Sequence, residues 1–81
     1  MCSFISVLNK SSGVLQVIID DETVFHDIIP DTETKQKKVL YASIRVIVKN
    51  GREKPILDLW LPIKKETSHT LTVWDTSYNF R

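Results

Sequence analysis

The sequence has little of three things that would narrow its function: cysteine, glycine and long apolar runs. Cys2 is the single cysteine in 81 residues, so the intramolecular disulfide on which small secreted domains usually depend is excluded. The two glycines, Gly13 and Gly51, lie far apart, which excludes a glycine-rich phosphate-binding loop. No apolar run approaches the roughly 20 residues of a membrane helix, and the first residues lack a secretory signal. These absences predict a soluble, cytoplasmic protein.

Side chains that carry catalysis or bind metals are also few. His26 precedes Asp27 and Ser68 precedes His69, but neighbours on a strand point to opposite faces, so neither pair can act as a base and its orienting group. Two histidines and one cysteine at these spacings match no metal-binding signature. We therefore predict no enzyme activity, no catalytic residues, no metal site and no cofactor.

What the sequence does contain is a series of short runs rich in Val, Ile, Thr and aromatic residues, separated by polar turn clusters. Such runs are typical of antiparallel strands. They cover residues 2–8, 14–20, 23–28, 38–41, 43–49, 55–63 and 70–75. We predict one all-β domain over residues 1–81, a small antiparallel β-sandwich of about seven strands, immunoglobulin-like or transthyretin-like.

The polar clusters predict how these strands are connected. Asp20-Asp21-Glu22 and Asn50-Gly51 are hairpin turn signals. Residues 9–13 have the composition of a further hairpin-like return, and residues 64–68 are expected to join the last two strands as a final hairpin. Residues 29–37 form the longest linker, which we expect to cross between the sheets.

The predicted final hairpin carries two tryptophans on its outer face. If the apolar residues of both strands point inward, Trp60 lies opposite Thr72 and Asp58 lies opposite Trp74. Trp60 and Trp74 are then diagonal neighbours within aromatic reach. We predict a partner-binding surface of Trp60, Trp74, Thr72 and Asp58, which serves a homo-oligomer or a protein partner.

Other interpretations of the two tryptophans remain open at this point. The C-terminal tail, with Tyr78 and Phe80, would cover them if it docks on the body of the domain. A shifted register would place one of them in the core. A carbohydrate-binding platform would use the same exposed rings.

The charges are unevenly distributed although the net charge is only +1. Residues 1–34 hold one lysine and six acidic residues, whereas residues 35–65 hold nine basic and two acidic residues. Either the two segments face each other, or the second presents a basic surface to nucleic acid or another polyanion. The residues of that alternative surface are Lys35, Lys37, Lys38, Arg45, Lys49 and Arg52.

Three segments of the chain resemble the bacterial domain-of-unknown-function family 4397. Residues 14–24 look like that family's strand, acidic turn and strand, residues 44–51 look like its strand before a polar loop, and residues 59–62 with 70–73 are similar to its final hairpin. The family's Pro-Gly-Thr-Tyr entry to a central strand is replaced here by Leu-Tyr-Ala-Ser at residues 40–43. The resemblance implies a β-sandwich and no particular chemistry.

Overall fold

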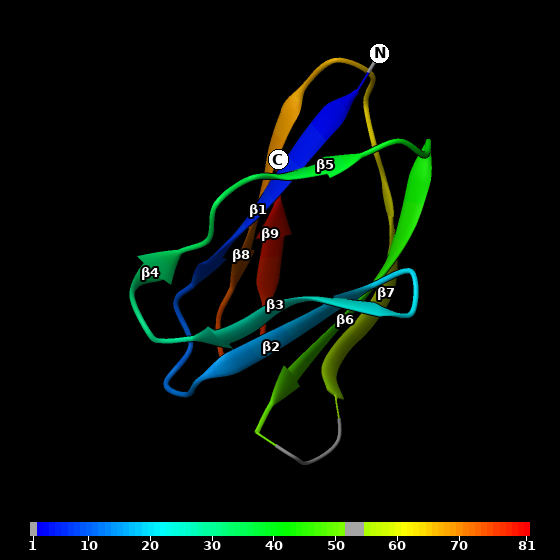
Figure 1. Ribbon diagram of the computed structural model, residues 1–81. Coiled ribbons are helices and arrows are strands. Elements are labelled where there is room, and N and C mark those ends of the chain that lie inside the picture. Colours follow the sequence, from blue (N-terminus) through cyan, green and yellow to red (C-terminus); the bar gives the residue numbers. More distant parts are fainter. Residues whose placement is uncertain (1, 52–54) are drawn as a thin grey trace.

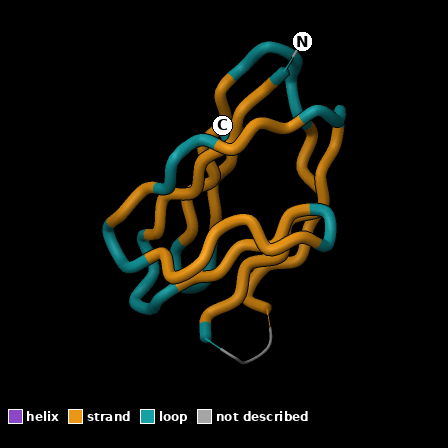
Figure 2. The backbone as a smooth tube through the Cα atoms, in the orientation of Figure 1, coloured by secondary structure: helices purple, strands orange, loops and turns teal. Residues whose placement is uncertain are grey.

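The computed structural model describes residues 2–51 and 55–81, and within these ranges it contains nine β-strands and no helix (Figure 2). The prediction of an all-β protein is confirmed. Two of the strands were not predicted, because they are short and lie in the expected linker and tail. The strands are β1 (Ser3–Asn9), β2 (Leu15–Ile19), β3 (Glu22–Ile28), β4 (Thr32–Glu33), β5 (Lys37–Val39), β6 (Ser43–Asn50), β7 (Pro55–Pro62), β8 (Ser68–Val73) and β9 (Tyr78–Phe80).

The strands form two sheets, which Figure 1 shows as two layers. Sheet A has the order β4-β1-β8-β9, and β5 also pairs with β1. Sheet B has the order β3-β2-β6-β7. Every pair is antiparallel except β1 and β8, which run parallel from Phe4 opposite Ser68 to Asn9 opposite Val73. The first and last long strands of the chain are therefore direct neighbours.

Apolar side chains from both sheets meet in one core. The alternation that predicted the strands also selects these residues, because every second side chain of a strand points to the same face. Strand β6 shows the pattern plainly, since Ile44, Val46 and Val48 are fully buried and the residues between them are not. The core consists of Ile5, Val7, Leu15, Val17, Ile19, Ile28, Val39, Ile44, Val46, Val48, Leu61, Ile63, Leu71 and Val73.

The two hairpins of sheet B form where the turn signals predicted them. Asp20 and Asp21 connect β2 to β3 with φ angles of 49° and 66°. Positive φ at both central residues defines the type I′ turn, whose twist matches that of antiparallel strands. Gly51, with a φ of 76°, follows β6 at the start of the loop to β7. The expected crossing between sheets at residues 29–37 is also confirmed, because β3 belongs to sheet B and β4 to sheet A.

Two other predicted hairpins are wrong. The segment 9–13 connects β1 of sheet A to β2 of sheet B, and the segment 64–68 connects β7 of sheet B to β8 of sheet A. Both are crossovers, although their polar composition is that of hairpin loops. Strand β8 pairs with β1 and β9 instead of β7.

A buried asparagine holds the first of these crossovers. Asn9, with no exposed surface, donates through Nδ2 to the carbonyl oxygens of Gly13 (2.8 Å) and Ile28 (2.7 Å). Its Oδ1 accepts from the backbone N–H and the hydroxyl of Ser11 at 2.8 and 2.6 Å. Because Ile28 ends β3, the Asn9 side chain ties that edge of sheet B to sheet A.

The C-terminal residues dock on the body through β9, as the alternative interpretation allowed. Tyr78 pairs with Val73 and Phe80 with Leu71. The ring of Phe80 stacks on His69 with 4.9 Å between the centroids. The tail therefore extends sheet A, whereas Trp60 lies on β7 of sheet B.

Candidate interaction surface

The outer side of β6 and β7 carries the most exposed tryptophan of the molecule. Trp60 is 65% exposed and lies directly opposite Arg45 on β6. Asp58 lies opposite Ile47, so these four side chains share one face of sheet B. We call this group, Arg45, Ile47, Asp58 and Trp60, the Trp60 face.

A two-pronged ion pair orders the charged half of the Trp60 face. Arg45 donates from Nε to Oδ1 of Asp58 at 3.1 Å and from Nη2 to Oδ2 at 2.9 Å. The hydrogen bond from Arg45 is the main reason that the pKa of the Asp58 carboxyl is lowered, and the same bond raises the pKa of the Arg45 guanidinium. The planar fork of arginine fits a carboxylate in this geometry, which fixes both side chains beside the indole.

The backbone of β7 has a free edge next to this face. Ile63 donates its N–H to the carbonyl oxygen of Ala42 at 2.8 Å, so these two residues form a hydrogen-bonded pair. Hydrogen-bonded and non-hydrogen-bonded pairs alternate along an antiparallel ladder, and therefore Leu61 and Leu59 also form hydrogen-bonded pairs with β6. The N–H and C=O groups of Asp58 and Trp60 therefore point away from β6. Strand β7 is the last strand of sheet B, so these groups face outward from the sheet.

Both ends of this free edge are interrupted. The backbone of Pro62, like that of Trp60, faces away from β6, but proline has no N–H to donate. At the other end the register shifts, so that Pro55 instead of Ile56 lies opposite Lys49. The regular free edge is thus limited to the backbone groups of Asp58 and Trp60.

The predicted pairing of the two tryptophans is wrong. Trp74 follows β8 in sheet A, whereas Trp60 belongs to sheet B, so they are not diagonal neighbours. Thr72 lies opposite Leu8 and Asn79, and Asp58 does not face Trp74. The Trp74 residue is 41% exposed, and its backbone N–H donates to the carbonyl oxygen of Ser77 at 2.9 Å. The four predicted residues therefore divide into two pairs: Asp58 and Trp60 lie together on sheet B, whereas Thr72 and Trp74 line one hollow on sheet A.

The basic residues of the alternative surface are divided between the two sheets. Lys35, Lys37 and Lys38 lie in or just before β5 of sheet A, with Lys37 and Lys38 on opposite faces of that strand. Arg45 and Lys49 lie on β6 of sheet B, and Arg45 is paired with Asp58. Arg52 lies outside the described residues.

The acidic and basic segments do not face each other through ion pairs in the described ranges. The two ion pairs found there are Lys10–Asp31, at 3.2 Å, and Arg45–Asp58. The first lies entirely in the acidic segment and the second entirely in the basic segment. The two segments nevertheless lie side by side across strands, because β2 pairs with β6 and β1 with β5. The backbone N–H of Arg45 donates to Oδ1 of Asp20 at 3.0 Å.

In the described part of the chain neither histidine forms a hydrogen bond or an ion pair with an Asp or Glu side chain. His69 is 7% exposed; its Nδ1 lies 2.9 Å from the carbonyl oxygen of Arg81 and its Nε2 accepts from the backbone N–H of Lys64 at 3.2 Å. A carbonyl oxygen can only accept, so Nδ1 carries the proton. His26 lies exposed on β3. Within residues 2–51 and 55–81, no three side chains of the metal-binding types gather into a site.

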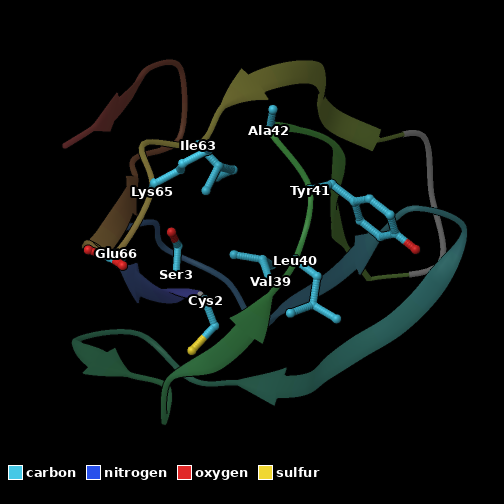
Figure 3. Close-up of a pocket in the computed structure, with 9 residues that line it drawn as sticks. All are labelled: Cys2, Ser3, Val39, Leu40, Tyr41, Ala42, Ile63, Lys65 and Glu66. Carbon is cyan, nitrogen blue, oxygen red and sulfur yellow. The ribbon is translucent and has the colours of Figure 1, made fainter.

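A small apolar pocket opens at one end of the molecule, near the beginning of β1 and the β5–β6 turn (Figure 3). Its volume is about 180 Å³. Val39 and Ile63 point toward its centre, while the ring of Tyr41 is directed away from it (Figure 3). Leu40 and Tyr41 are each 67% exposed. Lys65 and Glu66 also line the pocket, but among the described residues they form no ion pair with each other. The pocket has the character of an incompletely filled end of the core.

The role of Arg45 was not predicted from the sequence, in which it was grouped with the basic residues. The hairpin signal Asn50-Gly51 and the alternation on both strands contain the information to set β6 against β7, and that register places Arg45 opposite Trp60. The free edge of β7 was not predicted either, because that strand was expected to pair with β8.

No family model, no curated protein and no solved structure matches this chain. The resemblance to family 4397 therefore stays a prediction from the quoted segments. In the described part of the chain, no helix has the length and apolar character that spanning a membrane requires.

Proposed function

We propose that this protein is a non-enzymatic interaction module that self-associates through the Trp60 face. The observation that carries the proposal is the position of Trp60, which is 65% exposed next to an ordered arginine–aspartate pair. Tryptophan and arginine are the residues that most often anchor protein–protein contacts.

The Trp60 face combines a large apolar surface with side chains that are already fixed. An indole covers much area at a small cost in side-chain entropy. Arg45 is held by two hydrogen bonds to Asp58, so less of its freedom is lost when a partner binds. Ile47, half-buried between them, extends the apolar part of the face.

The proposal includes a class for the fold, a small β-sandwich of immunoglobulin-like or transthyretin-like type. It is supported by the single core to which both sheets contribute. In such folds one face of each sheet covers the core, and the outer faces are available for partners.

Light scattering coupled to gel filtration tests the proposal. We expect the wild-type chain to associate, and Trp60→Ala to raise the dissociation constant by at least about 30-fold, as a central anchoring residue does. Trp74→Ala is the matched control, because it removes an exposed tryptophan from the other sheet. A wild-type protein that is monomeric at every concentration, or equal losses for both substitutions, would contradict the proposal.

A further inference from the structure

The free edge of β7 gives the proposed self-association a specific geometry. We infer that two copies join β7 to β7 antiparallel about a twofold axis, with Asp58 of one copy opposite Trp60 of the other. This inference rests on the proposed function and names both the partner, a second copy of this chain, and the register of the contact.

The outer edge of β7 has unpaired backbone groups. Asp58 and Trp60 each direct one N–H and one C=O away from β6. Such groups on an edge strand are a template for another strand. In the described parts of the chain no hydrogen bond of Asp58 or Trp60 on that side is found.

The twofold arrangement that pairs Asp58 with Trp60 satisfies all of these groups. Each N–H of one residue meets the C=O of the other, which gives four hydrogen bonds across the axis. Pairing Asp58 with its own copy would place two carboxylates opposite each other, which is unfavourable. Pairing Trp60 with its own copy would place the C=O of Asp58 opposite Pro62, which has no N–H. Of the three registers, the one that pairs Asp58 with Trp60 is therefore the most favourable.

The side chains agree with this register. The two Trp60 rings become diagonal neighbours across the axis, about 7 to 8 Å apart between backbone positions, which is within aromatic reach. On the inner face Leu59 lies opposite its own copy. Leu59 and Leu57 are only half-buried in one copy, and a second β7 would cover the side that sheet B leaves open.

The interruptions of the edge explain why a second copy is the occupant. Pro62 and the register shift beside Ile56 limit the regular edge to two residues, which is the length that a twofold pair consumes. After pairing, β7 is an interior strand and its edge is closed. The result is a dimer with a continuous sheet of eight strands, four from each copy, and not an open fibre.

Asp58→Pro tests the hydrogen bonds directly. Its N–H faces the free edge, so proline removes a bond across the axis in each copy and leaves the ladder to β6 intact. We expect the dimer dissociation constant, measured by sedimentation equilibrium, to rise at least about 30-fold. Asp58→Ala is the matched control, because it also removes the carboxylate but keeps the N–H; we expect a rise of no more than about fivefold.

A cysteine at Leu59 tests the register. In a Cys2→Ser background, Leu59→Cys places a thiol opposite its own copy in a non-hydrogen-bonded pair, where the Cα separation of about 4.5 Å suits a disulfide. We expect a covalent dimer on mild oxidation. Leu61→Cys, whose cross-axis neighbour is Leu57, is the control and is expected to remain unlinked. A covalent dimer from Trp60→Cys without one from Leu59→Cys would overturn the register.

The outcomes separate this inference from the proposed function. If Trp60→Ala abolishes association while Asp58→Pro remains a folded dimer and Leu59→Cys does not cross-link, the edge contact is wrong and the Trp60 face stands. If the wild-type chain does not associate at all, both are wrong. Circular dichroism shows whether Asp58→Pro is folded. If it is unfolded, the cross-linking of Leu59→Cys alone tests the contact between the two β7 strands.

Discussion

The two edge strands of sheet B, β3 and β7, differ in how far their backbone groups are protected from pairing with another strand. At one edge, β3 has two register shifts against β2, a positive φ of 50° at Asp27, and acidic side chains at Glu22 and Asp27. Its end is tied to sheet A by the bond from Asn9 to Ile28. At the other edge, β7 keeps a regular register with β6 from Pro62 to Leu57.

This difference shows that one sheet can prevent pairing on one side and offer it on the other. Bulges and charges are the usual means of protecting an edge strand, and β3 has both. Strand β7 carries a tryptophan and two half-buried leucines beside two free pairs of backbone groups. If the protein associates as proposed, this asymmetry directs the contact to the β7 side of sheet B.

The largest effect is expected from moving a proline by one position along β7. Leu59 has its N–H in the ladder to β6, in contrast to Asp58, so Leu59→Pro loses a sheet hydrogen bond and part of the core. We expect a loss of about 3 kcal/mol or more in the free energy of unfolding. Thermal denaturation followed by circular dichroism measures it. A Leu59→Pro variant as stable as Asp58→Pro would show that the edge has been assigned to the wrong residues.

The next largest effect is expected from removing the Asn9 hydrogen bonds that hold the end of β3. Asn9→Ala removes four hydrogen bonds of a fully buried side chain and leaves the carbonyl of Ile28 without its donor. We expect a loss of about 2 to 3 kcal/mol, with faster amide hydrogen exchange near the end of β3 than in β7. Ser12→Ala, at the exposed side of the same loop, serves as the control. Uniform acceleration across both edges would argue against a local tie.

A charged side chain on β7, like those that protect β3, is expected to weaken association without destabilising the fold. Trp60→Lys places a charge on the exposed outer face, so the melting temperature should change little while the dimer weakens by at least about 30-fold. Thr23→Lys, on the outer part of the β3 edge, is the comparison and should leave the dimer unchanged. Analytical ultracentrifugation of both variants measures the contrast. A weakened dimer in Thr23→Lys would place the contact at the wrong edge.

The smallest effect concerns the ion pair beside the β7 edge. The pKa of the Asp58 carboxyl is lowered by Arg45, so the contribution of this pair is present above the ordinary aspartate pKa and is lost as the pH falls through the lowered value. We expect a carboxyl titration followed by NMR to show Asp58 protonating at lower pH than an isolated aspartate, and Arg45→Ala to return it toward the ordinary range. An unchanged Asp58 titration in Arg45→Ala would contradict the assigned cause.

The parts of this fold that sequence could predict are the local ones. Asp20-Asp21 and Asn50-Gly51 set their hairpins because the turn residues tolerate positive φ, and the alternation of Ile44, Val46 and Val48 identified the buried face. The tail docking was an open alternative, since Phe80 finds its partner only when His69 is in place.

What sequence could not predict is which loops cross between sheets. Segment 9–13 resembles a hairpin loop, but the buried Asn9 side chain uses its hydrogen bonds to join β3 to sheet A. The parallel pair of β1 and β8 has no local signal at all, because its partners are about 60 residues apart. The predicted surface of Trp60 and Trp74 was lost with that error. Whether the two rings are exposed was left open by the sequence, and the structure shows both of them exposed.

The parallel pair of β1 and β8 also constrains how the chain folds. During synthesis, β2 and β3 can pair as soon as they emerge, but β1 must wait for β8 before the centre of sheet A is complete. A contact between segments so far apart in the sequence forms more slowly than a local hairpin, because the loop must close before the pairing stabilises it. Until residue 73 has left the ribosome, one edge of β1 stays unpaired, because β4 and β5 both pair along its other edge. An unpaired edge exposed in this interval is open to wrong pairing.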